Sequence, residues 1–500
     1  MRLKRTQNDF RVTEVIDEDG LFSEGPFSLY RVTKRGVTTF EAADVLAKAA
    51  GVPREQVAYA GLKDKDGVTS QIMSVEGGRP VSLREDGMVI RPVSRAARPI
   101  ESGDSRGNSF EIVMRDLSGD DMRRIRVNLA ELKDGAVPNY FDDQRFGCLR
   151  HGQGFIVRHL LKGDVENALR SLLAAPSPYG NEKTEQFKAY IQKHWGQWEK
   201  LHGYCRARRG ASVFAHLVEH PEDFAGALER GISNRERTIH LFAYQSHLWN
   251  RAAAIRVREI VGDEDVAWLP GDAGSLPVWR RLAPVQLEQL RSFRLPLLGP
   301  DGELPPEAEA LYRKVFRLEG LPMSAFLRLD LSGFRPRSEE RPFLVEPEFL
   351  RAAPAQRDDL YRKRQCMRVR FTLPRGQYAT LVCKRLGMPT ERGYAPLRIW
   401  VARHPLDWPD DEGNTTPMAD RNDRRHWSER GKPRGRRDER GGPRRDDRRG
   451  VRREDYRDGR RDQRPPRKER RDGPPRGDKP SPWGQAMRKR KREEEEGGDE

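Results

Sequence analysis

The stretch "AYAGLKDKDGVTSQ", Ala58 to Gln71, places a single carboxylate, that of Asp64, between Lys63 and Lys65. A short apolar run precedes it and predicts a strand, so the acid lies where a strand gives way to a loop. If the backbone is extended, lysines one residue to either side point away from Asp64 and are better placed to meet phosphate than to neutralise the acid. Taken alone, the stretch is more typical of a solvated surface turn.

Composition limits the classes of protein to consider. The chain has 500 residues, enough for two or three domains, but with 36% hydrophobic and 34% charged residues it is too polar to be globular throughout. A formal net charge of +17 favours a polyanionic partner, either nucleic acid or an anionic membrane surface. No apolar run approaches the roughly 18 residues that span a bilayer, and the first residues do not resemble a signal peptide. We therefore expect a cytoplasmic protein with no membrane partner.

The four cysteines are widely scattered, and no two of them show a paired spacing. This pattern favours neither a disulfide framework nor a zinc cluster. We expect free thiols and no metal at Cys148, Cys205, Cys366 and Cys383.

The sharpest change in composition falls after about residue 408. Residues 421–492 consist largely of Arg, Asp, Gly and Pro and carry a net charge of +17, whereas the final eight residues carry −6 and residues 1–420 only +6. Such a segment buries too little apolar surface to offset its ordering entropy, so we expect disorder. We interpret this tail as a nonspecific RNA tether, and the alternative is a solvated extension.

Before the tail, the patterns predict a mixture of α and β structure. Thr38 and Glu41 have capping-box spacing at the start of a helix that Gly51 would end, and "QVAYA" predicts the strand that follows. Alternation in "NSFEIVMRDL" and "MRVRFTLP" predicts half-buried strands of an antiparallel or mixed sheet. Residues 155–345 are mainly helical in pattern. One helical face there carries Leu241, Tyr244, Leu248, Ala252 and Ile255.

Three further segments combine aromatic and polar side chains. "VPNYFDDQRFG", Val137 to Gly147, has neither helical nor strand periodicity, and its Asn139 amide suits either a base edge or a catalytic carboxylate. The alternative is an ordered loop packed into the core. "LKRTQNDF" at the N-terminus and "LPRGQYATLVCKRLG", with Tyr378 at a strand-to-helix junction, each predict only a buried aromatic when read alone.

Together these segments resemble, in order and spacing, the TruD family of pseudouridine synthases. The family signature Gly-x-Lys-Asp-Lys-x-Ala-x-Thr-x-Gln stands here with Gly67 in place of Ala, and the segment Asn-Tyr-Phe-Gly-x-Gln-Arg-Phe-Gly stands with Asp142 in place of Gly. The likeness covers about residues 1 to 400. It is also carried by "RGNSFEIVMR", by "QNDF", by Ser246 with Asn250, and by the run from Gly376 to Thr380.

The resemblance implies an α+β fold, with a mixed, largely antiparallel sheet in a pseudouridine synthase catalytic domain. We expect an N-terminal catalytic part over 1–154, a mainly helical insertion domain over 155–345, a C-terminal catalytic part over 346–408 and a disordered basic tail over 409–500. The implied reaction converts uridine to pseudouridine, typically at position 13 of tRNA, after the base is flipped out, with no cofactor. The implied partners are tRNA and other structured RNA, with no obligate protein partner.

By family match, Asp64 would be the catalytic residue. The side chains expected to bind substrate supply ring faces, an amide and positive charge. They are Phe10, Asn139, Tyr378, Phe141, Lys4, Lys63, Lys65 and Arg145. Asp142 stands where the family has Gly, and this replacement leaves the conformation of the loop open. A change from Gly to Asp introduces strain wherever the backbone is left-handed.

Two other functions stay open. A non-catalytic RNA scaffold or chaperone would act through the Arg-rich tail, and deletion of 415–500 would then remove its function while leaving an enzyme's turnover intact at low salt. A glycosidase-like hydrolase would use Asp142 and Asp143, but adjacent acids on an extended chain point in opposite directions.

Overall fold

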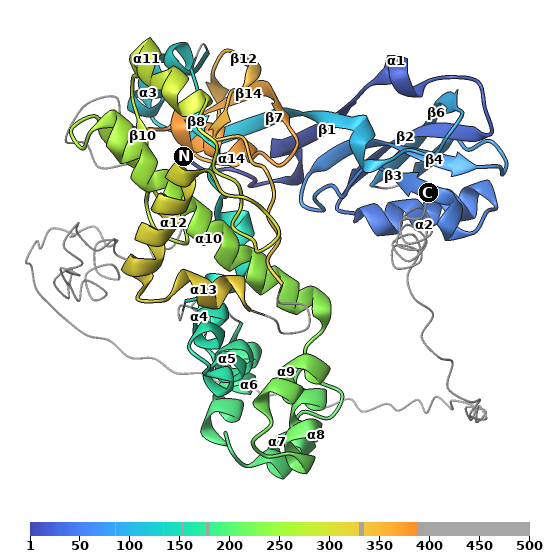
Figure 1. Ribbon diagram of the computed structural model, residues 1–500. Coiled ribbons are helices and arrows are strands. Elements are labelled where there is room, and N and C mark those ends of the chain that lie inside the picture. Colours follow the sequence, from blue (N-terminus) through green and yellow to red (C-terminus); the bar gives the residue numbers. More distant parts are fainter. Residues whose placement is uncertain (86, 134, 152–153, 177–180, 330–334, 389–500) are drawn as a thin grey trace, which may run out of the picture. The chain divides into compact units, whose positions relative to one another are not determined.

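The structure is a computed structural model that describes residues 1–388, apart from residues 86, 134, 152–153, 177–180 and 330–334 (Figure 1). The predicted tail, 409–500, and the last residues of the predicted C-terminal catalytic part lie outside the described residues. Among the described helices, none is both long enough and apolar enough to cross a membrane.

The main β structure is a sheet of ten strands, which are β1 (Phe10–Ile16), β2 (Phe27–Arg35), β3 (Val57–Tyr59), β4 (Val68–Glu76), β5 (Leu83–Glu85), β6 (Met88–Ala96), β7 (Ser105–Leu117), β12 (Glu348–Ala352), β13 (Gln356–Arg357) and β14 (Gln365–Pro374). Its strands follow the order β12-β14-β7-β1-β4-β2-β6-β5, with β13 beside β14 and β3 beside β4. Strands β1 and β4 are parallel, and the remaining pairs recorded for this sheet are antiparallel. The predicted mixed, largely antiparallel sheet is confirmed.

Helices make up most of the middle of the chain. They are α1 (Glu18–Leu21), α2 (Thr39–Ala50), α3 (Gly119–Lys133), α4 (Ile156–Leu161), α5 (Val165–Ala174), α6 (Glu182–Lys193), α7 (Trp198–Tyr204), α8 (Ala211–Glu219), α9 (Phe224–Gly231), α10 (Asn234–Val261), α11 (Pro284–Arg291), α12 (Pro306–Glu319), α13 (Met323–Leu327) and α14 (Ala379–Leu386). Four 3-10 segments are η1 (Gln7–Asp9), η2 (Arg54–Gln56), η3 (Ser102–Asp104) and η4 (Asp143–His151). Two small sheets pair β8 (Val137–Pro138) with β11 (Leu344–Val345), and β9 (Val266–Leu269) with β10 (Leu276–Trp279).

Helix α2 forms where the sequence predicts it. The Thr38 hydroxyl accepts a hydrogen bond from the Glu41 backbone N–H at 3.1 Å, and the Glu41 carboxylate accepts one from the Thr38 N–H at 2.7 Å. Gly51 ends the helix with a left-handed φ of 74°, which glycine adopts without steric cost. The predicted strand, β3, follows, and the loop between β3 and β4 then carries Asp64.

Strands β7 and β14 pair along most of their length, with Phe110 opposite Phe371. Both predicted strands are thus confirmed. The alternation differs at Arg115, which is buried rather than facing solvent. Its guanidinium donates hydrogen bonds to Asp9 and to Asp358, each at 2.9 Å, so the buried charge is compensated.

Residues 156–327 are mainly helical, as predicted, with the β9–β10 hairpin as an exception. Helices α5 to α9 gather near the N-terminal end of α10 (Figure 1). Their apolar side chains share one core with β7 and β14, whereas a second core lies between α2 and strands β2, β4 and β6. The domain boundaries at 154, 345 and 408 stay predictions. The helical face predicted for α10 is buried along its length, at Leu241, Tyr244, Leu248, Ala252 and Ile255.

Candidate active site

A cavity of about 930 Å³ opens between the sheet and helix α10. Its walls come from segments far apart in the sequence: the N-terminal strand β1, the Asp64 loop, the segment before η4, helix α10, residues 337–342 and the start of α14. Eight of the nine residues predicted for the site line this cavity, and their individual roles stay predictions. They are Lys4, Phe10, Lys63, Asp64, Asn139, Phe141, Arg145 and Tyr378.

Each carboxylate oxygen of Asp64 accepts one hydrogen bond from a different part of the chain. Lys4 Nζ lies 3.0 Å from Asp64 Oδ2, and Gln144 Nε2 lies 3.2 Å from Asp64 Oδ1. The side chain of Asp64 remains 33% exposed. The carboxylate is therefore held in a fixed orientation and stays accessible from the cavity.

Lys4 connects the acid to an aromatic ring. Its ammonium lies 3.8 Å from the centre of the Phe10 ring, a cation–π distance. Lys4 also adopts a left-handed φ of 52°, a conformation that costs free energy for a non-glycine residue.

A buried lysine, Lys34, donates hydrogen bonds to the backbone of the Asp64 loop. Lys34 is 1% exposed, and its ammonium donates to the carbonyls of Val37 at 2.9 Å, Lys63 at 3.2 Å and Asp64 at 2.9 Å. Burial lowers the pKa of Lys34 to about 8, although the neighbouring Asp64 opposes that shift. The backbone that carries the acid is therefore fixed by one cation. Sequence analysis did not identify Lys34, but a lysine on the apolar face of a strand, two residues after Val32, is a signal of a buried charge.

Two further side chains, those of Thr39 and Gln71, also form hydrogen bonds with the backbone of this loop. The Thr39 hydroxyl accepts from the Lys63 N–H at 2.9 Å, and Gln71 Nε2 donates to the Gly61 carbonyl at 2.9 Å. Gln71 is the last residue of the signature stretch, so the motif contains part of its own scaffold.

The two lysines that flank Asp64 differ from each other in their surroundings. Lys65 is exposed and does not line the cavity, so it is free to face solvent or phosphate. The ammonium of Lys63, which lines the cavity, lies 2.7 Å from the fully buried Glu14 carboxylate. A contact of Lys63 with phosphate stays a prediction, and it would compete with this ion pair.

Aromatic rings line two walls of the cavity. Phe10 contacts Phe110 at 6.0 Å between ring centres, and Phe110 contacts Phe371 at 5.6 Å, so the ring nearest Asp64 is backed by the core of the sheet. Across the cavity, Tyr378 meets Phe141 edge to face at 6.1 Å. Tyr378 lies at the N-cap of α14, the strand-to-helix junction that its sequence predicts.

Asn139 is 1% exposed, and its side chain is already bonded within the protein. Its amide nitrogen donates to the Pro342 carbonyl at 2.9 Å, and its amide oxygen accepts from Arg341 Nη2 at 2.8 Å. The predicted hydrogen bond from Asn139 to a base would therefore compete with these partners. In the geometry described here, Asn139 positions Arg341.

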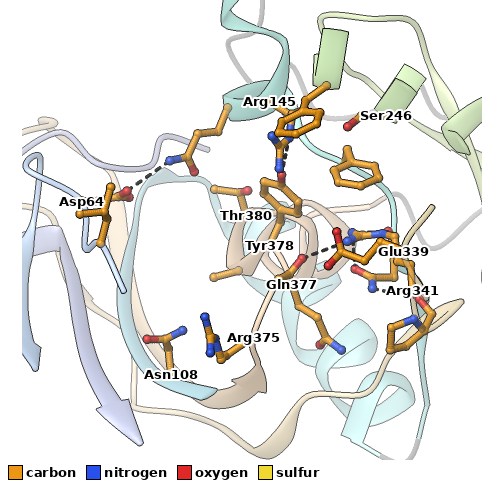
Figure 2. A pocket seen from close by; sticks show the side chains of 18 of the residues that line it. Asp64, Asn108, Arg145, Ser246, Glu339, Arg341, Arg375, Gln377, Tyr378 and Thr380 are labelled. Carbon is orange, nitrogen blue, oxygen red and sulfur yellow. Dashed lines mark hydrogen bonds between the residues drawn. The ribbon is translucent and has the colours of Figure 1, made fainter. Parts of the chain in front are cut away.

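Arg341 is the clearest cavity residue that sequence analysis missed. Its guanidinium lies 3.8 Å from the centre of the Phe141 ring and donates to the Asn139 carbonyl oxygen at 2.7 Å. Burial lowers the pKa of Arg341 to about 10, which leaves it charged at neutral pH. Arg145 lies on the same ring, at 5.3 Å, and donates to the Tyr378 hydroxyl at 3.4 Å. Two cations thus converge on one aromatic wall (Figure 2).

Asp142, which replaces the family's Gly, does not strain the loop. It is not among the described non-glycine residues with positive φ, and its carboxylate is buried against Lys384, at 2.6 Å, and the Thr380 hydroxyl. Asp143 shares the same ammonium, at 2.6 Å. Burial, together with the neighbouring Asp142 carboxylate, raises the pKa of Asp143 to about 6, and Lys384 opposes this shift. Neither acid lines the cavity, which removes the basis for a paired-acid hydrolase.

Metal ligands do not gather at this site. Within the described ranges, no group of three or more His, Cys, Asp and Glu side chains is arranged to hold a metal ion. The four cysteines have free thiols.

Comparison with known proteins agrees with this fold. The family model described as tRNA pseudouridine synthase D (TruD) matches residues 1–386. The chain belongs to the TruD family. A relative from Geobacter metallireducens, named tRNA pseudouridine synthase D, is 31% identical over 400 residues, which cover 77% of this chain and 94% of that protein. A Methanococcus maripaludis relative, named probable tRNA pseudouridine synthase D 1, is 29% identical over 392 residues, which cover 77% of this chain and 99% of that protein.

A solved structure also resembles this one. The crystal structure of a TruD protein from Methanosarcina mazei matches with a TM-score of 0.60 and 22% identity, over 77% of this chain and 92% of that chain. This likeness supports the α+β fold. The family predicted from the sequence motifs is thus confirmed.

Proposed function

We propose that this TruD-family pseudouridine synthase isomerises a uridine of tRNA, typically at position 13, and that Asp64 is its catalytic residue. The observation that supports this most directly is the carboxylate itself. Both of its oxygens are held by side chains from distant segments, it remains accessible, and it lies in a cavity whose other walls are aromatic and cationic. A cavity of this kind suits a flat, polar base attached to an anionic backbone.

The reaction needs one acid and no change of oxidation state. The bond from N1 of uracil to C1′ of the ribose breaks, the uracil turns over, and a bond from C5 to C1′ forms while the C5 proton is lost and N1 gains a proton. Asp64 either attacks C1′ or removes the C2′ proton to give a glycal, and both routes are compatible with a single accessible carboxylate. Lys4 and Arg145 carry positive charge that would stabilise the departing uracilate.

The target base has to leave its stack before a carboxylate can reach C1′. Flipping a base out costs a few kcal/mol, and stacking on an aromatic ring returns about 1 to 3 kcal/mol per base. The half-buried ring of Tyr378 and the rings of Phe10 and Phe141 line the same cavity as Asp64. Ring faces of this kind offset much of the cost of flipping.

Replacing Asp64 by Asn tests this proposal, with Asp66→Asn as the matched control. Asp66 is an exposed acid of the same loop and does not line the cavity. We expect Asp64→Asn to lower the rate of tritium release from tRNA labelled at uridine C5 by at least about 10²- to 10⁴-fold, and Asp66→Asn to leave it unchanged. The assay contains EDTA and no nucleotide, and RNA binding is measured separately.

The assignment of Asp64 fails if the Asp64→Asn variant releases tritium at the parental rate. The activity as a whole fails if the parent protein forms no pseudouridine in tRNA. Retained RNA binding by an inactive Asp64→Asn variant places the defect in the chemical step.

A further inference from the structure

The cavity extends well beyond the neighbourhood of Asp64. In Figure 2, Asp64 lies on one side, whereas Ser246, Glu339 and Arg341 lie on the other, with Tyr378 between them. The volume of about 930 Å³ is near the upper end of the roughly 300 to 1,000 Å³ that pockets for drug-sized ligands occupy. One flipped nucleotide beside Asp64 therefore leaves the α10 end of the cavity unfilled.

The α10 end of the cavity carries an exposed apolar surface. Ile239 is 50% exposed and Phe242 is 36% exposed, and both line the cavity. They are three residues apart on α10 and so lie on one face of the helix. Single exposed apolar residues are common on protein surfaces, but two on one helix face that line the cavity proposed for RNA indicate a binding surface.

Positive charge lies next to this surface. Arg337 is exposed and lines the cavity, and Arg341 and Arg145 lie near the Phe141 ring, which lines it too. Two acids also line this part of the cavity. Glu340 forms an ion pair with Arg294, and Glu339 is exposed and lies near enough to Arg341 to oppose the lowering of the pKa of that arginine. Cations beside an exposed ring are the combination by which proteins hold single-stranded nucleic acid, since the ring stacks a base and the arginines contact phosphate.

We propose that the α10 end of the cavity, formed by Ile239, Phe242 and Arg337, binds the base of a nucleotide adjacent to the target uridine in the RNA. That base stacks on Phe242, and its phosphate lies near the arginines. The inference rests on the proposed function, because it requires an RNA chain with its target uridine beside Asp64. It makes Phe242 a determinant of how the RNA strand is held rather than of the chemical step.

Binding of RNA that lacks one base tests the inference. All proteins carry Asp64→Asn so that the bound RNA is not converted, and the ligands are a tRNA transcript and two copies in which the nucleotide before or after the target uridine lacks its base. We expect Phe242→Ala to raise the Kd for the intact RNA by about 5- to 150-fold, the effect of losing one stacked base. One of the two abasic RNAs should bind equally well to the protein with Phe242 and to the Phe242→Ala variant.

Two further variants separate stacking from damage to the fold. Phe242→Trp keeps a ring and should bind intact RNA about as tightly as the protein with Phe242. Val285→Ala removes a 69% exposed apolar side chain from α11, outside the cavity, and should change nothing. Thermal unfolding of each variant reports on its stability.

The inference is overturned if Phe242→Ala binds intact RNA as tightly as the protein with Phe242, or if it loses the same factor for the intact and both abasic RNAs. Its failure is distinguishable from failure of the proposed function, which is tested by tritium release from tRNA with the unsubstituted chain. A protein that releases tritium normally but shows no coupling between Phe242 and a neighbouring base keeps its function and loses this subsite.

Discussion

Replacing Lys34 by Met should separate the activity of this enzyme from its stability. The ammonium of Lys34 holds three backbone carbonyls, two of them in the Asp64 loop. At about 1.5 kcal/mol each, three charge-assisted hydrogen bonds contribute about 4 to 5 kcal/mol. The net drop in the pKa of Lys34 from 10.5 to about 8, in which burial outweighs the attraction of Asp64 and Glu41, corresponds to a cost of about 3 kcal/mol for the charged form, and Met removes this cost. The variant should therefore be less stable by only about 1 to 2 kcal/mol.

The loss of activity should be much larger. Without Lys34, the carbonyls of Lys63 and Asp64 lose the cation that fixes them, and a displacement of about 1 Å at a catalytic group costs about 10²-fold in rate. Single-turnover tritium release measures the chemical step, and urea unfolding measures stability. Lys48→Met, which replaces an exposed lysine on α2, is the matched control and should change neither. A Lys34→Met variant that keeps the parental single-turnover rate would refute the reasoning. A loss of rate that is fully explained by the fraction of unfolded protein, calculated from the measured stability, would also refute it.

The same lysine predicts a dependence on pH. Above about pH 8 the Lys34 ammonium loses a proton and keeps two donors for three carbonyls, so kcat of the parent should decline as pH rises through 8. Stability should change in the opposite sense. Because the folded pKa lies below 10.5, the unfolded chain binds more protons between about pH 8 and 10.5, and the contribution of this group to the free energy of unfolding increases with pH over that window.

Three more variants test other parts of the site. In Gly67→Ala, the added Cβ would lie 2.7 Å from the Phe10 carbonyl oxygen. We therefore expect the free energy of unfolding in urea to fall by about 1 to 3 kcal/mol and kcat to be reduced. If neither quantity changes, the close packing of Gly67 against Phe10 is contradicted. Lys384→Met should lower the free energy of unfolding by about 3 to 5 kcal/mol, because it leaves Asp142 buried without a cation. Adding Asp142→Asn should restore more than half of that loss. If it restores nothing, the two side chains are not energetically coupled. Because the folded pKa of Asp143 is raised from 3.8 to about 6, its contribution to stability is present below pH 4 and lost as pH rises through 6. The free energy of unfolding of the parent relative to Asp143→Asn should therefore fall by about 2 kcal/mol between pH 4 and 7, and a difference independent of pH would contradict the raised pKa.

Local signals in the sequence predicted the elements that carry the site. The capping box before α2, the alternation in β7 and β14 and the strand-to-helix junction at Tyr378 all appear in the structure. Each of these signals depends on residues a few positions apart, whose contacts follow from backbone periodicity alone. The motif that contains Asp64 was recognisable for the same reason.

What the sequence by itself determined, then, was the family and the secondary structure around the site, and it supplied the prediction that Asp64 is the catalytic acid. Only the tertiary structure decided which charged side chains are paired with other side chains of the protein. Lys63 pairs with Glu14, Asp142 pairs with Lys384, and Arg341 is held by Asn139, across 49, 242 and 202 positions of the chain. Such pairs depend on strand register and on the packing of helices against the sheet, and no local pattern encodes either of these. The cations that remain available to RNA are therefore known only once the chain is folded.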